Sequence, residues 1–242
     1  MKRKAIIIAS PLRKGHSGFL PGVKYDAINY ASFLTSTLGG AWRSNEIDIL
    51  VNPSKAQIIE TMFYTKSDYV FTAFSGHGGI DTKTKKAFLN INENESIWLS
   101  QLTAKASRQL AIVDTCSTFL NYGFSEKPQL IGDPFGPVSR LSLSQARIIF
   151  DNRVMASRKG WTVIHSASPG EASIDTEEGG AFSLSILKTA KIWERLEGHG
   201  HILPVSVAYS SSSKYLKSKF KVNQTPRILH SGVNPNFPFA VK

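Results

Sequence analysis

Residues 108–119 read RQLAIVDTCSTF and contain the only cysteine of the 242-residue chain. The apolar residues 110–113 predict a strand that is buried on both faces, and residues 114–117 predict the loop that leaves it. Open α/β sheets carry reactive groups at the carboxyl ends of their parallel strands, because the strands hold the backbone rigid while the loops line a crevice. Cys116 therefore lies where a nucleophile is expected.

A second strand-like stretch ends in a histidine. Residues 68–79 read DYVFTAFSGHGG, in which residues 69–74 predict a strand and residues 75–79 the turn after it. If the two strands are parallel neighbours, their ends lie about 5 Å apart, so His77 and Cys116 could meet as a catalytic dyad. The glycines after His77 leave backbone N–H groups able to face an oxyanion, and we expect the N–H groups of Gly78 and Cys116 to do so.

The other apolar patterns predict a single α/β domain. Early in the chain, strands and helices alternate in the order that indicates a parallel sheet with right-handed crossovers. The expected strands cover residues 4–10, 46–51, 161–168 and 227–230, and a hairpin lies within residues 86–99. The expected helices cover residues 26–38, 53–66 with Asn52 as the cap, 182–196 and 205–220. We predict a mostly parallel central sheet of about six strands with helices on both faces, a three-layer sandwich.

Composition narrows the function classes. The formal charge of +11 permits attraction to nucleic acid, to anionic membranes or to acidic partners. A basic stretch at residues 210–227 has no zinc-finger spacing or RNA-recognition pattern beside it, so a solvated helix face is favoured and nucleic-acid binding is not expected. One cysteine excludes an internal disulfide. The chain has no apolar run of 18 or more residues, so we expect no membrane span, no signal peptide and a cytoplasmic location.

Several short motifs together resemble the caspase-like cysteine peptidases, and within them the metacaspases and bacterial orthocaspases more than the animal caspases. The matching pieces are KAIIIAS, LPG followed by DA, SGHGG, DTCS, GGAF and QTPRI, which occur in the family's order over nearly the whole chain. The residues around Cys116 read DTCST instead of the QAC signature of animal caspases. This departure favours the metacaspase side.

The resemblance implies a caspase-like fold with a large-subunit-like part (1–120), a linker-like region (121–160) and a small-subunit-like part (161–242). It also implies a cysteine endopeptidase in which metacaspase-type acids, matching Asp26 and Asp114 and helped by Ser75, hold an Arg or Lys at P1. The position of an animal-caspase arginine that holds a P1 Asp is Leu20 here, which disfavours P1 Asp. The family further suggests a regulated protease of cell death or defence.

Plainer interpretations remain open for these residues. Asp26 could be a carboxylate at a helix N-terminus, Asp114 could cap a turn, and a lone cysteine is often only a small buried hydrophobe. The acid-rich residues 171–178 could receive a basic substrate, bind Ca²⁺ or form a solvated loop. No cofactor or metal is required by the predicted chemistry, whereas activation by Ca²⁺ or by a partner is left open. The alternatives to a peptidase are a non-catalytic caspase-fold binding module and a basic nucleic-acid-binding protein.

Overall fold

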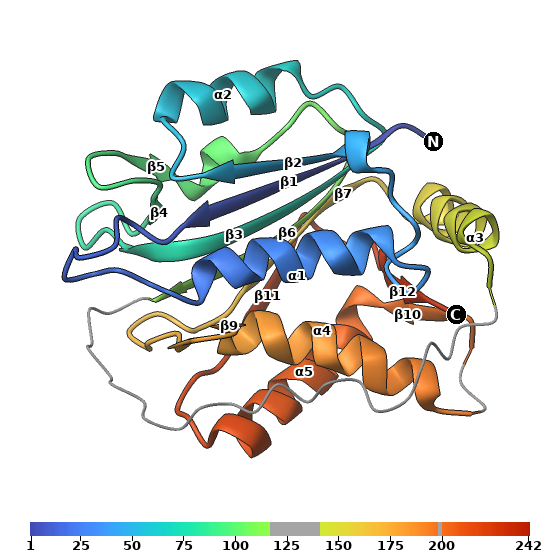
Figure 1. Cartoon of the computed structure of the whole chain (residues 1–242). Coiled ribbons are helices and arrows are strands. Elements are labelled where there is room, and N and C mark those ends of the chain that lie inside the picture. Colours follow the sequence, from blue (N-terminus) through green and yellow to red (C-terminus); the bar gives the residue numbers. More distant parts are fainter. Residues whose placement is uncertain (117–140, 198–199) are drawn as a thin grey trace.

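A central sheet organises the chain (Figure 1). The computed structural model describes residues 1–116, 141–197 and 200–242, with the backbone alone at Cys116. Six strands lie in the order β11-β7-β6-β3-β1-β2. Their bounds are β1 (Arg3–Ser10), β2 (Ile47–Val51), β3 (Tyr69–Ile80), β6 (Arg108–Cys116), β7 (Gly160–His165) and β11 (Arg227–His230). All are parallel except β11, which pairs antiparallel with β7. The predicted mostly parallel sheet of about six strands is confirmed.

Helices cover both faces of this sheet, which makes three layers (Figure 1). One face carries the helices α1 (Val23–Thr35), α3 (Leu143–Ala156), α4 (Ala181–Arg195) and α5 (Val205–Phe220). The other carries α2 (Lys55–Tyr64), the 3-10 helix η2 (Leu99–Leu102) and the hairpin of β4 (Ala87–Asn90) and β5 (Ser96–Trp98). Successive residues of a strand point to opposite faces, so β1, β3 and β6 each contribute buried residues to both cores.

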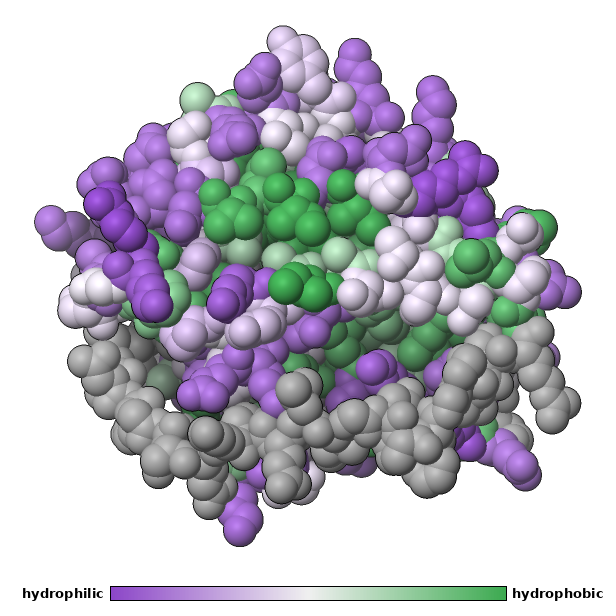
Figure 2. Space-filling view, in the orientation of Figure 1, coloured by the Kyte–Doolittle hydropathy of each residue, from purple (hydrophilic) through white to green (hydrophobic). Residues whose placement is uncertain are grey.

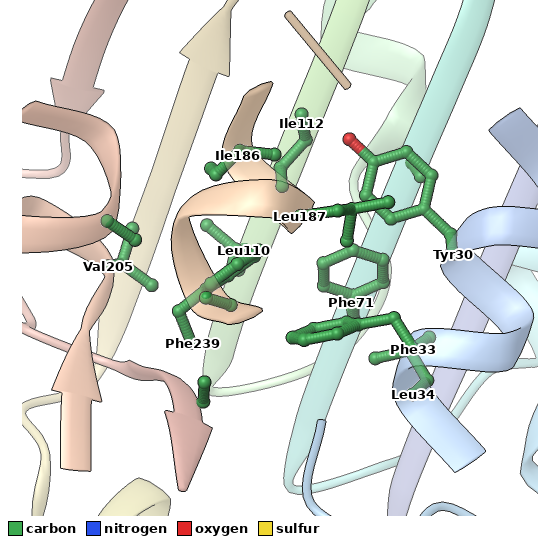
Figure 3. Close-up of a cluster of buried hydrophobic side chains, with 14 of the residues drawn as sticks. Tyr30, Phe33, Leu34, Phe71, Leu110, Ile112, Ile186, Leu187, Val205 and Phe239 are labelled. Carbon is green, nitrogen blue, oxygen red and sulfur yellow. The ribbon is translucent and has the colours of Figure 1, made fainter. Parts of the chain in front are cut away.

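The larger core lies between the sheet and α1, α4 and α5. Phe71, Leu110 and Ile112 of the sheet meet Tyr30 of α1 and Ile186 of α4 there, all nearly inaccessible to solvent (Figure 3). Burying an apolar side chain of this size contributes about 1.5–3 kcal/mol each. These contacts fix α1 and α4 over the sheet, and both helices begin near the carboxyl ends of the parallel strands. The packing therefore carries the helix N-termini to the edge where the predicted site lies.

The two strands that carry the predicted dyad are longer than expected. The predicted turn at residues 75–79 is wrong, because β3 continues to Ile80, and β6 includes Cys116 where a loop was expected. Pairing explains the difference: β3 is paired with β6 as far as His77 and then with β4 from Gly78 onward. A Cβ on Gly78 would lie 2.8 Å from the carbonyl oxygen of Phe88, so the glycine lets β4 approach this closely.

Other differences are local. Ser54, not Asn52, caps α2 by accepting a hydrogen bond from the Gln57 N–H, while the Asn52 Oδ1 accepts one from the Leu12 N–H. The sequence patterns missed the short strands β8 (Asp175–Thr176), β9 (Gly179–Gly180), β10 (Ile202–Pro204) and β12 (Pro238–Val241). Helix α3 occupies part of the linker-like region, of which residues 121–140 lie outside the described residues.

One face of the molecule carries an apolar patch over β2 and α1, bordered by hydrophilic residues (Figure 2). Its most exposed members are Ile28, Ile49 and Val51. Strand β2 forms one edge of the sheet and β11 the other. In the part of the chain that the structure describes, no helix is long and apolar enough to cross a membrane.

Candidate active site

The two residues predicted as a dyad are neighbours across two parallel strands. His77 of β3 is the register partner of Cys116 of β6, and Ser75 is the partner of Asp114 two residues earlier. Adjacent strands lie about 4.8 Å apart, so the backbones of His77 and Cys116 are side by side at the carboxyl end of the sheet. The proximity inferred from strand order is therefore found in the backbone register, while catalytic roles for both residues stay predictions.

The orientation of His77 depends on a residue that the sequence did not point out. The His77 Nε2 lies 2.5 Å from the carbonyl oxygen of Gly18, in the loop between β1 and α1. A carbonyl oxygen can only accept, so Nε2 carries the proton and the neutral ring keeps its lone pair on Nδ1. Nδ1 is then the nitrogen able to act as a base. A backbone carbonyl leaves no trace in residue identity, which is why no sequence signal marks Gly18.

The three residues predicted for the P1 pocket are also brought together. Asp26, Ser75 and Asp114 are 1%, 3% and 5% exposed, so the group is nearly dry. The Ser75 hydroxyl donates a hydrogen bond to Asp26 from the middle strand of the sheet. Asp26 lies in the first turn of α1, and Asp114 is near the end of β6. One helix and two strands therefore deliver these side chains to one buried cluster.

The N-terminus of α4 supplies backbone donors to both carboxylates. The Gly180 N–H donates to Asp26, with distances of 3.0 and 3.1 Å to its two oxygens. The Ser183 N–H and hydroxyl donate to the Asp114 Oδ2 at 2.9 and 2.8 Å. A helix N-terminus carries partial positive charge, which stabilises an anion placed there. This structural role at α4 differs from those considered from the sequence, which were the N-terminus of its own helix for Asp26 and the turn after its strand for Asp114. It leaves binding roles for both acids compatible with it.

A third carboxylate, Asp175 of β8, completes the cluster. Its Oδ2 accepts a hydrogen bond from the Gly22 N–H at 3.1 Å, whereas its Oδ1 is buried without a hydrogen-bond partner among the described residues. The sequence placed Asp175 among four acids of residues 171–178 and gave no reason to choose it. Its selection depends on the fold of the β8–β9 hairpin, which no local pattern predicts.

Burial and nearby negative charge raise the pKa values of Asp26 and Asp175 in this cluster. Burial, followed by the charge of Asp114, raises the pKa of Asp26 well above its usual value. Burial raises the pKa of Asp175 to about 7, where Asp114 adds to the effect and the Gly22 N–H opposes it. None of Asp26, Asp114 and Asp175 takes part in an ion pair within the described residues. Three neighbouring carboxyl groups without a cation form a place where a positively charged group would be stabilised.

The structure says less about the predicted oxyanion role of Gly78 and about a Ca²⁺ site in the acid-rich residues 171–178. Gly78 lies opposite Leu89 of β4 and next to His77, and the oxyanion role of its N–H stays a prediction, as does that of the Cys116 N–H. In the described residues, no group of three or more His, Cys, Asp or Glu side chains is arranged to hold a metal ion. Activation by Ca²⁺ is not tested by this observation.

The sheet order, the antiparallel last strand and the helices on both faces define a caspase-like fold. No protein-family model and no curated protein matches the sequence. Among solved structures, the chain is similar to caspase-1 from Spodoptera frugiperda, with a TM-score of 0.62 and 13% identity over 100% of this chain and 92% of that one. It is also similar to protein GSU0716 from Geobacter sulfurreducens, with a TM-score of 0.59 and 18% identity over 100% of this chain and 99% of that one. At these identities the likeness shows the fold alone, and the metacaspase type stays a prediction.

Proposed function

We propose that this protein is a cysteine endopeptidase that uses His77 and Cys116 and cleaves after Arg or Lys. The observation that carries the proposal is the register pairing of His77 with Cys116 beside the buried Asp26 and Asp114 and the half-buried Asp175, which have no cationic partner among the described residues. A reactive pair and a cation-accepting cluster at the same end of the sheet fit one substrate. The caspase-like fold agrees with a protein or peptide substrate.

The chemistry follows from the two ring nitrogens of His77. A free thiol titrates near pH 8.5, so a proton acceptor at Cys116 is needed to give thiolate at neutral pH. In the proposal, Nδ1 of His77 takes the Cys116 proton and the thiolate attacks the peptide carbonyl carbon. The Gly78 and Cys116 N–H groups stabilise the oxyanion. As the C–N bond breaks, His77 gives its proton to the leaving amine, and water then hydrolyses the thioester.

Specificity is assigned to the carboxylate cluster. A guanidinium donates several hydrogen bonds in a fixed plane, so two or three carboxylates bind it with charge-assisted bonds. Asp26 and Asp114 are the acids proposed to meet the P1 side chain, with Ser75 holding Asp26 and Asp175 adding a third charge. Removing one partner of such a buried charged contact costs about 2–5 kcal/mol.

Strand β9, formed by Gly179 and Gly180, covers Asp26 and Asp114. It has to move before a substrate side chain can reach these two acids. A Cβ on Gly179 would lie 2.4 Å from the Asp26 Oδ1, and one on Gly180 would lie 2.3 Å from the Asp114 Oδ2. The glycine backbone therefore packs directly on the two acids. In the proposal, β9 moves aside when the P1 side chain enters, and the guanidinium replaces backbone N–H donors with stronger charged ones.

The test compares matched fluorogenic peptides that differ only in P1, one with Arg and one with Asp, with and without Ca²⁺. Wild type should cleave the Arg peptide, and Cys116→Ala and His77→Ala should lose that cleavage. His201→Ala removes an exposed histidine remote from Cys116 in the sequence, and it should retain wild-type activity. Cleavage of the Arg peptide by Cys116→Ala would overturn the mechanism, and cleavage of the Asp peptide alone would overturn the pocket.

The second candidate is a non-catalytic caspase-fold module that works by binding. The hydrogen bonds of Asp26 and Asp114 to the α4 N-terminus favour it, because they give both acids a purely structural role. Under this candidate neither peptide is cleaved under any of the conditions. Cys116 would also fail to react with a thiol-directed affinity probe that carries a P1 Arg.

A further inference from the structure

The loop that contacts His77 is itself ordered by a second histidine. His16 is exposed and lies two residues before Gly18, in the segment between β1 and α1. Its Nδ1 accepts a hydrogen bond from the Gly18 N–H at 3.0 Å. The carbonyl oxygen of the same Gly18 accepts from the His77 Nε2. Gly18 is thus held between the two histidine rings, one on its N–H and one on its carbonyl.

The local geometry is that of a tight turn in which His16 takes the first position. The Phe19 N–H donates to the His16 carbonyl oxygen at 3.0 Å, which closes the turn. A side-chain acceptor at the first position that binds the N–H two residues later is the arrangement usually supplied by Asn or Asp. His16 supplies it with a ring nitrogen. The peptide groups before and after Gly18 are therefore both held by His16. Its ring accepts from the Gly18 N–H, and its carbonyl oxygen accepts from the Phe19 N–H.

The turn leaves little room for Gly18 to shift. A Cβ on Gly18 would lie 3.1 Å from the His77 Nε2 and 3.4 Å from the His16 Nδ1. The ends of the segment are tied as well, because the Leu20 N–H donates to the Pro11 carbonyl oxygen at 2.9 Å. A rotation of the Gly18 peptide would remove the acceptor from the His77 Nε2. The proton could then move to the other ring nitrogen, which would no longer be a base.

We propose that His16 is a positioning residue for the dyad: by holding the Gly18 N–H, it aims the Gly18 carbonyl oxygen at the His77 Nε2 and so selects the Nε2–H tautomer, in which Nδ1 is the basic nitrogen. This inference goes beyond the roles assigned to His77 and Cys116, and its functional meaning rests on the proposed peptidase activity. Within the described part of the chain, the hydrogen bonds of His16 join it to Arg13, Gly18 and Phe19, so its effect on His77 passes through Gly18. Loss of the contact should therefore alter turnover without altering binding of the P1 side chain.

The test uses His16→Ala, which removes the acceptor, and His16→Asn, whose side-chain oxygen can restore it in the same kind of turn. With the P1-Arg peptide, His16→Ala should lower kcat about 2- to 10-fold, the worth of one hydrogen bond, with KM unchanged. His16→Asn should return kcat to the wild-type value. Ser17→Ala, at the exposed neighbour, is the matched control and should change neither constant.

A second measurement does not depend on peptidase activity. Nitrogen NMR of the imidazole rings, with His77→Gln used to assign the His77 signals, reports which ring nitrogen carries the proton. Wild type and His16→Asn should show the Nε2–H form of His77, and His16→Ala should show a mixture of both forms. Equal tautomer populations in all three proteins would overturn the inference. If wild type cleaves no peptide, the proposed function fails while this measurement still decides the role of His16.

Discussion

Carboxylates gather at both ends of the parallel strands, and the two groups are built differently. At the amino end, Glu46 and Asp151 are bound by Arg3 and Arg147: the Arg3 guanidinium lies 2.8 Å from Asp151 and the Arg147 guanidinium 2.5 Å from Glu46. Burial alone would raise the pKa of Glu46, but hydrogen bonds from Arg147 and the Arg43 N–H, with the charge of Arg3, lower it to about 2. These charges are neutralised within the chain.

At the carboxyl end, the cluster of Asp26, Asp114 and Asp175 has backbone and hydroxyl donors but no cation among the described residues. Burial raises the pKa of Asp175 to about 7, the opposite of the shift at Glu46. A buried charge without a partner lowers the free energy of unfolding, so this cluster does not stabilise the fold when no cation is bound to it. The amino-end group is explained by stability, whereas the carboxyl-end cluster is, in our proposal, completed by a cation of the substrate.

The largest expected effect is on stability at the amino end. Arg3→Ala removes one of the two arginines that pair with Glu46 and Asp151, and the same guanidinium lies 4.5 Å from the centre of the Trp42 ring. We expect it to lower the free energy of unfolding by about 3–5 kcal/mol, because Arg147 alone then compensates two partly buried carboxylates and a ring contact is lost as well. Urea unfolding measures this. Lys4→Ala, which breaks only the more exposed pair with Asp48, is the control and should cost less than about 1 kcal/mol.

At the carboxyl end the same kind of change should affect activity instead of stability. Asp26→Asn keeps the shape of the side chain, and its oxygen can still accept the Gly180 N–H. We expect kcat/KM for the P1-Arg peptide to fall about 30-fold or more, since one charged contact worth about 2–5 kcal/mol is lost. The exposed-face change Asp48→Asn is the control. An unchanged kcat/KM in Asp26→Asn would contradict the proposal that the carboxyl-end cluster binds substrate while the amino-end group stabilises the fold.

The pH dependence of substrate binding gives a smaller effect. Because burial raises the pKa of Asp175 to about 7, this group gains its negative charge as the pH rises through neutrality. KM for the P1-Arg peptide should therefore fall several-fold between about pH 6 and about pH 8. In Asp175→Asn the pH dependence of KM should flatten. A steeper dependence in the variant than in wild type would contradict the assignment.

The smallest effect is on stability against pH. The pKa of Asp26 is raised in the folded state by burial and by Asp114, so the folded protein binds more protons than the unfolded chain above the usual aspartate pKa. Stability therefore falls as the pH rises from the usual aspartate value toward the raised one. We expect the melting temperature of wild type to decline over this window more than that of Asp26→Asn. Scanning calorimetry at a series of pH values compares the two proteins. Equal declines of the two melting temperatures with pH would contradict a raised pKa of Asp26 in the folded state.

Much of the fold could be predicted from the sequence because the sheet consists of uninterrupted apolar runs. Helix α5 and strand β11 have the bounds that the sequence patterns predicted, and the parallel direction of β1, β2 and β3 followed from alternating strands and helices. The wrong turn at residues 75–79 has a physical cause. Glycine and serine are typical of turns, but pairing with β6 and β4 keeps this segment extended.

The residues of the candidate site likewise fall into those that the sequence pointed to and those that it did not. The meeting of His77 and Cys116 could be predicted only on the assumption that their strands are parallel neighbours, and the pairing of β3 with β6 supplies that condition. Gly18 could not be chosen, because its contribution is a backbone carbonyl oxygen. Asp175 could not be separated from the other acids of its loop, because its selection depends on the close approach of the β8–β9 hairpin to Gly22, which leaves the Asp175 Oδ1 buried.

The central claim is that the carboxyl-end cluster is completed by the charge of the substrate. The most direct measurement is the ratio of kcat/KM for two peptides that differ only at P1, one with arginine and one with citrulline, which has nearly the same shape but no charge. The account predicts that the arginine peptide is preferred about 30-fold or more, and that this preference shrinks in Asp26→Asn. Equal cleavage of both peptides by wild type would contradict it.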